Sequence, residues 1–188
     1  MITKHFMNPQ NNPKRYGLLH ISLHWIMLAL LVAVYLCMDL SDNFPKGSDT
    51  RNALKTWHYM LGLSVFVLVW FRLATRLAST EPAIFPPPPL WQTRLAQAVQ
   101  TGLYILMFGM PLLGWLLLSA KGQIVPFFGL QLPALMSENK AAAGWIKDIH
   151  EAGATAGYVL VGLHAGAALF HHYFLRDNTL RRMLPGAR

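Results

Sequence analysis

The sequence predicts an all-α fold: an integral membrane four-helix bundle with both termini on the cytoplasmic side. Two observations carry this prediction, namely four long apolar blocks and an uneven distribution of positive charge. The chain of 188 residues is 54% hydrophobic and 13% charged, whereas a soluble domain usually has about 25% charged residues. A buried soluble core is disfavoured, because four such blocks leave too little polar sequence to cover them. We expect residues 1–188 to form a single membrane domain.

Each apolar block is long enough to cross a bilayer, which takes about 20 residues. Backbone polar groups in lipid must bond within their own segment, so each block is expected to be a helix. The expected spans are about 18–40, 54–77, 95–119 and 141–175. Four successive prolines at 86–89 predict a stiff connector after the second span. Apolar residues in the loop at 120–140 predict a cap that lies on the bundle.

Positive charge indicates the orientation. If the first sixteen residues are cytoplasmic, the cytoplasmic segments hold ten Lys and Arg residues against two acidic ones, and the opposite segments hold six of each. Lys and Arg are enriched on the cytoplasmic side of membrane proteins. Topology therefore accounts for the net charge of +8, and nucleic acid is not an expected partner.

Seven of the eight histidines fall within the expected spans, and only His5 lies in a tail. Ionisable residues inside a membrane are rare and face the bundle interior, so each is a functional candidate. The seven are His20, His24, His58, His150, His164, His171 and His172.

The histidine positions predict two haem sites. His150 and His164 are 14 residues apart, so their side chains share one face of the helix and stand about 21 Å apart along it. His58 lies near the outer end of its span, as His150 does, and His24 lies near the inner end, as His164 does. Helix bundles hold cofactors between side chains of facing helices. We therefore predict two b-type haems, with axial pairs His58/His150 and His24/His164.

Other interpretations remain open at this point. Gly62, Gly153 and Gly157 follow the predicted ligands by about one or two turns, and they either admit a flat macrocycle or help helices to pack. A structural zinc site gathers its ligands at one point, which disfavours zinc here. A non-redox membrane protein, with histidines that only bond between helices, is a further alternative.

Several short strings carry a resemblance to a known family. They are ISLHW at 21–25, WH at 57–58, GLH at 162–164 and HHYF at 171–174, which is followed by DNTL at 177–180. The chain from Tyr16 to Pro185 resembles the bacterial cytochrome b561 family, and within it the small di-haem superoxide oxidases. The resemblance implies haem ligands at His24, His58, His150 and His164, in agreement with the pairing reached from depth and rotation.

The resemblance also implies a function. Such a protein is an oxidoreductase of the bacterial inner membrane that oxidises periplasmic superoxide and reduces ubiquinone (superoxide:ubiquinone oxidoreductase). Its partners would be membrane lipid, quinone and superoxide, with no obligate protein partner. The alternative within the family is a cytochrome b anchor subunit, which passes electrons between a hydrogenase or another dehydrogenase and the quinone pool.

Further residues are candidates for binding substrates and haem propionates. His171 lies two turns past His164 and, with Ser22 and His20, is a candidate for the quinone site. Arg72 and Arg76 are candidates for propionate contacts, or they anchor the helix at the headgroups. The outer cations are candidates for steering superoxide, or they serve only solubility and topology. These cations are Lys121 and Lys140, together with Lys147 and Arg51.

Overall fold

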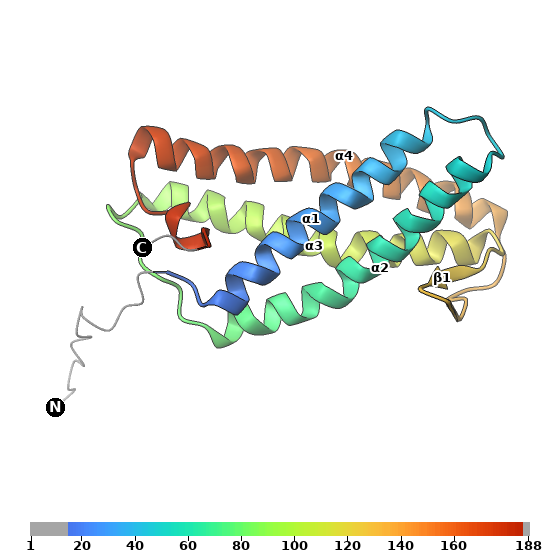
Figure 1. The fold of residues 1–188 in the computed structure, drawn as a ribbon, viewed down its shortest axis with the longest axis horizontal. Coiled ribbons are helices and arrows are strands. Elements are labelled where there is room, and N and C mark those ends of the chain that lie inside the picture. Colours follow the sequence, from blue (N-terminus) through green and yellow to red (C-terminus); the bar gives the residue numbers. More distant parts are fainter. Residues whose placement is uncertain (1–14, 186–188) are drawn as a thin grey trace.

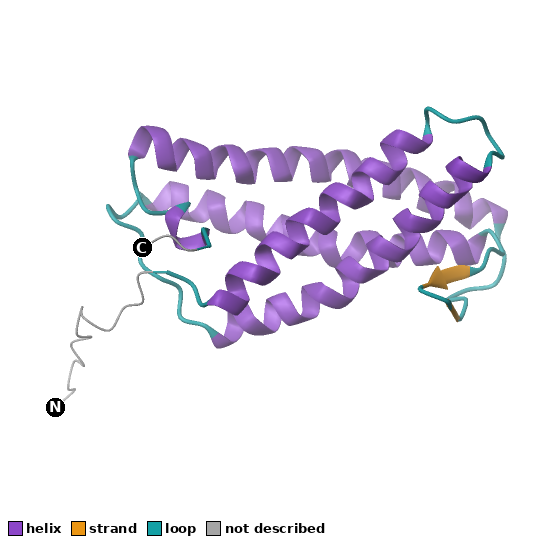
Figure 2. Ribbon diagram, viewed as in Figure 1, coloured by secondary structure: helices purple, strands orange, loops and turns teal. Residues whose placement is uncertain are grey.

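Four long helices form an elongated bundle in the computed structural model, which describes residues 15–185 (Figure 1). They are α1 (Leu18–Ser41), α2 (Asp49–Ala78), α3 (Leu90–Ala120) and α4 (Lys140–Phe170). A π-helical turn, His171–Leu175, continues α4, and a 3-10 turn follows at Arg181–Met183. Two short strands, β1 (Val125–Phe127) and β2 (Leu130–Leu132), complete the elements (Figure 2). His5, the cations at 4 and 14, and Arg188 lie outside the described residues.

The predicted membrane four-helix bundle is confirmed, because all four helices are long and apolar enough to cross a bilayer. Two of them begin earlier than expected. Ser48 caps the N-terminus of α2, because its side chain accepts a hydrogen bond from the Arg51 main-chain nitrogen. The hydropathy pattern does not mark this start. α3 begins directly after Pro89, at the end of the proline run. The helices therefore extend past the apolar blocks into polar sequence.

The helices pack as sequential neighbours. α1 packs on α2, α2 on α3 and α3 on α4. The α1–α2 loop and the β hairpin lie at one end of the bundle, and the proline-rich connector and both described ends of the chain lie at the other (Figure 1). These ends are called outer and inner below, after the orientation predicted from charge.

The buried core is small and central. Met27, Val65, Val69 and Met107 pack together between α1, α2 and α3. Many other apolar side chains face outwards, such as Trp70 at 56% exposed. In water such a surface would be unfavourable, whereas in a bilayer it contacts lipid tails.

The outer loop covers the bundle, as predicted from its apolar residues. β1 and β2 pair antiparallel through a tight turn at Phe128 and Gly129, both with positive φ. Val125 is buried against Leu63 and Leu118, which belong to α2 and α3. The short hairpin is the one departure from helix among the elements of the described chain.

The inner end is closed by the segment that follows α4. Arg176 adopts the left-handed conformation and turns the chain back on itself. The Asn178 side chain then donates to the Ala83 carbonyl and accepts from the Phe85 main-chain nitrogen, at 3.1 and 2.9 Å. We call residues 176–183 the C-terminal clasp, because they join α4 to the proline-rich connector.

Gly157 on α4 is predicted to be needed for close packing against α1. A Cβ at this position would stand 2.1 Å from the Tyr35 hydroxyl, which donates to the Ala154 carbonyl at 2.9 Å. Gly157→Ala should therefore lower the free energy of unfolding in detergent by about 1–3 kcal/mol. The change should cost less in a Tyr35→Phe background, where the clashing hydroxyl is absent.

Gly166→Ala on the same helix is the matched control, because nothing lies within 4 Å of a Cβ built there. Its unfolding free energy should stay at or slightly above that of the parent. Equal effects of Gly157→Ala and Gly166→Ala would contradict the packing role.

Candidate functional site

The outer histidine pair lies between α2 and α4. The ring centroids of His58 and His150 are 6.2 Å apart, with an angle of 76° between the ring planes. The inner pair lies between α1 and α4, where the centroids of His24 and His164 are 6.1 Å apart with a 62° angle. The structure thus brings together both pairs that depth and rotation predicted.

The spacing of each pair fits a metal held between two imidazoles. An imidazole nitrogen binds a metal at about 2 Å, and the ring centroid lies about 1 Å behind that nitrogen. Two axial rings on one iron therefore have centroids about 6 Å apart, as both pairs have. Within residues 15–185 no three His, Cys, Asp or Glu side chains gather around one point. The donor set suits two-histidine ligation of haem iron and offers no four-ligand zinc site.

A main-chain carbonyl orients the His58 ring. The His58 Nδ1 lies 3.0 Å from the Val34 carbonyl oxygen. Because a carbonyl only accepts, Nδ1 must carry the ring proton, and Nε2 is left with its lone pair. Ligating histidines commonly have such a partner on the other ring nitrogen. No side-chain pattern in the sequence marks this carbonyl.

Arg72 contacts the inner pair directly. Its Nη2 lies 3.0 Å from His24 Nδ1, and an arginine can only donate. If His24 binds iron through Nε2, Nδ1 carries a proton and this bond cannot persist. The guanidinium would then be released from His24. Arg76 is less available, because it pairs with Glu81 at 3.5 Å.

A cavity of about 400 Å³ lies beside the outer pair. It is lined mainly by apolar side chains of all four helices, and Gly62 adds no side chain to its wall. Its charged lining consists of three lysines, Lys55, Lys121 and Lys147, and two carboxylates, Asp39 and Glu151. Lys55 is a residue that the sequence analysis missed, although it precedes His58 by three positions and so lies about one turn further out on the same face.

The three glycines near the predicted ligands differ in role: one leaves room for a cofactor, and two allow helices to pack. Gly62 faces open space, which suits a cofactor beside His58. Gly153 and Gly157 are approached instead by the side chains of Met110 and Tyr35. Those two positions serve helix packing in this structure.

The candidates for the quinone site are not brought together by any contact within residues 15–185. His20 is buried and stacks on Tyr16 at 4.5 Å. His171 bonds to Asp177 instead. Ser22 makes no side-chain hydrogen bond to another described residue.

The outer cations also separate into two groups. Lys121 and Lys147 line the cavity, whereas Lys140 and Arg51 do not. Arg51 bonds to Asp42 at 2.8 Å, and Lys147 pairs with Glu151 at 2.7 Å. Within the described chain, no carboxylate forms an ion pair with Lys55 or Lys121.

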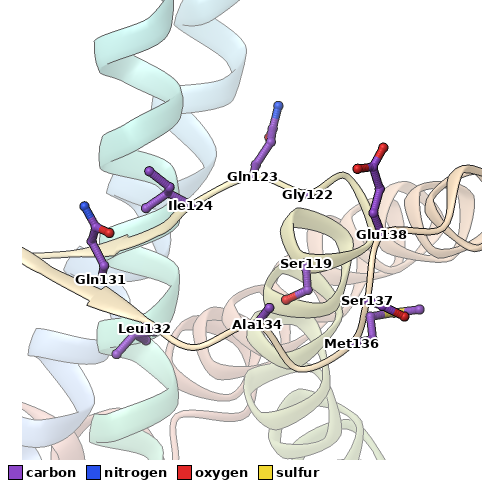
Figure 3. Close-up of a pocket in the computed structure, with 10 residues that line it drawn as sticks. All are labelled: Ser119, Gly122, Gln123, Ile124, Gln131, Leu132, Ala134, Met136, Ser137 and Glu138. Carbon is purple, nitrogen blue, oxygen red and sulfur yellow. The ribbon is translucent and has the colours of Figure 1, made fainter.

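A second hollow lies under the outer loop, between the end of α3 and the segment before α4 (Figure 3). Its deepest polar residue, Ser119, is already bonded on both sides, because its hydroxyl donates to the Trp115 carbonyl and accepts from the Leu135 nitrogen. The side chains of Gln123 and Glu138 extend away from Ser119. This hollow therefore presents no convergent set of ligand-binding groups.

Comparison with known proteins gives a consistent result. The family model described as prokaryotic cytochrome b561 matches residues 15–186. Cytochrome b561 homolog 1 of Escherichia coli (strain K12) is 42% identical over 171 residues, which are 91% of this chain and 97% of that protein. A protein of Yersinia pestis named probable superoxide oxidase CybB is 33% identical, over 93% of this chain and 98% of its own length.

A more distant relative, cytochrome b561 homolog 2 of Escherichia coli (strain K12), is 26% identical over 95% of both chains. Matches of this length and identity cover all four helices and every predicted ligand. The chain therefore belongs to the prokaryotic cytochrome b561 family, the haem b-binding, multi-pass electron-transfer proteins of the bacterial inner membrane.

Proposed function

We propose that this protein holds two b haems and carries electrons from periplasmic superoxide to membrane ubiquinone. The observation that carries the proposal is the presence of two facing imidazole pairs, each with the ring spacing of a six-coordinate iron. These four histidines would hold haem b, which would supply reversible one-electron transfer. The superoxide assignment is supported by the relative named probable superoxide oxidase, at 33% identity.

The reaction balances without further reagents. Two superoxide anions, one quinone and two protons give two dioxygen molecules and one quinol. The protein must therefore admit superoxide at the outer end. It must also supply two protons where the quinone binds. His171, with Ser22 and His20, is the proposed quinone-binding set, and Arg72 and Arg76 are the proposed propionate contacts.

The pairing of ligands is the first prediction. His58→Ala and His150→Ala should each lose about half of the haem, and the double variant should lose no more than either single variant, because both side chains hold the same group. His58→Ala combined with His24→Ala should lose nearly all of it. Pyridine haemochrome content per protein measures this directly.

His172→Ala is the matched control, because His172 is also on the fourth span but faces no second histidine in the described chain. It should keep the full haem content. Complete loss in the His58/His150 double variant, with half-loss in each single variant, would contradict the proposed pairs.

Electrostatic attraction at the outer cavity is the proposed route for superoxide. Lys55 and Lys121 line the cavity beside the outer histidine pair, and neither forms an ion pair with a described carboxylate. The charge of Lys147 is partly offset by Glu151. The lining holds these three lysines against two carboxylates, Asp39 and Glu151, so a small positive excess remains. Such an excess would raise the encounter rate of an anion. Lys140 lies further along the same end and would act at longer range.

Removing these charges should slow the reaction with superoxide. Lys55→Gln with Lys121→Gln should reduce the second-order rate by about fivefold and flatten its dependence on ionic strength. Lys121→Gln alone should have a larger effect than Lys140→Gln, because only Lys121 lines the cavity. Stopped-flow mixing of oxidised protein with superoxide provides the rate.

Lys46→Gln, in the α1–α2 loop, controls for a general change in net charge and should leave the rate unchanged. An unaltered rate in the double variant would refute steering at this cavity. A parent protein that superoxide does not reduce at all would instead favour the anchor-subunit alternative, which needs a protein electron donor.

A further inference from the structure

A partly buried histidine lies against a buried carboxylate at the inner end of the bundle. His171 Nδ1 is 2.5 Å from Asp177 Oδ2, and Asp177 is only 5% exposed. His171 is the first residue of the π-helical turn that ends α4. Such π-helical turns are rare and occur frequently at functional sites. The pair belongs to neither set of predicted haem ligands.

Asp177 is held rigidly within the C-terminal clasp. Its Oδ1 accepts a hydrogen bond from the Thr179 main-chain nitrogen at 2.8 Å, and its own nitrogen donates to the His171 carbonyl at 3.2 Å. Burial on its own would raise the pKa of Asp177, but the hydrogen bonds from His171 and Thr179 outweigh burial and lower the pKa below its ordinary value. The side chain is thus a fixed carboxylate at neutral pH.

A fixed carboxylate determines which nitrogen of His171 carries the proton. Because Asp177 only accepts, Nδ1 must donate to it. The other nitrogen, Nε2, makes no hydrogen bond to another residue in the range 15–185. It is therefore the ring atom left to bond a ligand, while Asp177 keeps a proton on Nδ1.

We propose that Asp177 is the positioning residue for proton delivery to quinone, holding His171 so that its Nε2 donates to the reduced quinone oxygen. This inference rests on the proposed reduction of quinone at the inner end. In each transfer the Nε2–H bond breaks, an O–H bond forms on the quinone, and His171 is left neutral with Nδ1–H still bonded to Asp177. The ring then takes a proton from the cytoplasmic water. Two such transfers accompany the two electrons that yield one quinol.

The test separates proton-coupled from simple electron transfer. Haem-loaded protein is reduced with a limiting amount of dithionite under anaerobic conditions and mixed in a stopped-flow instrument with a short-chain ubiquinone or with ferricyanide, which takes an electron and no proton. Reoxidation is followed in the reduced haem bands. Asp177→Asn should slow reoxidation by saturating quinone by about ten- to a hundredfold. The half-saturating quinone concentration and the ferricyanide rate should stay close to those of the parent.

Two further variants sharpen the result. His171→Gln leaves the Asp177–Thr179 bond in place and should give the same defect, and the double variant should be no slower than either single one. Glu81→Gln removes the other acidic side chain near the inner end, which is mostly exposed, and should behave as the parent. If Asp177→Asn lowers haem content, rates are compared per haem-loaded protein, and His171→Gln carries the same test.

The possible failures are distinguishable. Equal slowing with ferricyanide and quinone, or no slowing in either single variant, would overturn the role of Asp177 and leave quinone reduction standing. A parent protein that is reoxidised by ferricyanide but not by quinone would overturn the proposed function, and this inference with it.

Discussion

Four imidazoles are held in an apolar bundle where water cannot satisfy them, and this constraint organises the whole molecule. A polar ring buried in lipid without a partner costs several kcal/mol, so each ring needs a partner at its own depth. The chain meets this need with α4, which supplies one histidine to each pair, while α1 and α2 supply the other. The position of α4 is consequently fixed at two depths, against α2 at the outer pair and against α1 at the inner pair.

The two levels have different surroundings, and the proposed direction of electron flow follows from that difference. The outer pair adjoins a cavity whose lining holds three lysines and two carboxylates, a small positive excess. The inner pair adjoins Arg72, and the C-terminal clasp closes that end: Trp25, next to His24 in sequence, donates to the Met183 carbonyl at 2.8 Å. The proposed entry of superoxide uses the excess charge at the outer end, and the proposed reduction of quinone uses the closed inner end.

Much of this architecture follows from the sequence because two simple quantities determine it, the length of the apolar blocks and the spacing of the histidines. Block length gives the helices, and the separation of His150 from His164 gives the two depths. The first residues of α2 and α3 lie five positions earlier than predicted, since capping by Ser48 and the start after Pro89 do not depend on hydropathy. The Val34 carbonyl was not predictable, because every residue carries a carbonyl and only the helix crossing selects one.

The substrate residues were harder to predict than the ligands for a physical reason. A ligand must satisfy depth and rotation together, whereas a steering cation needs only to lie near the mouth of a cavity whose outline depends on the packed side chains. Lys55 lies one helical turn outside His58 on the same face of α2. It was not predicted as a steering cation, because the prediction considered lysines and arginines outside the expected span 54–77. Lys140 met the loop criterion and yet does not line the cavity.

The C-terminal clasp shows how a loop can couple structure to proton chemistry. His171 was chosen for its position on the face of α4, but a face alone leaves the tautomer undefined. The tautomer is defined by Asp177, six residues later, and that carboxylate reaches the ring only because Arg176 adopts a left-handed conformation and reverses the chain. The same reversal sends Asn178 to the proline-rich connector between α2 and α3. A rigid connector therefore holds the carboxylate, the carboxylate holds the ring, and the ring presents one defined nitrogen at the end of the bundle where quinone would be reduced.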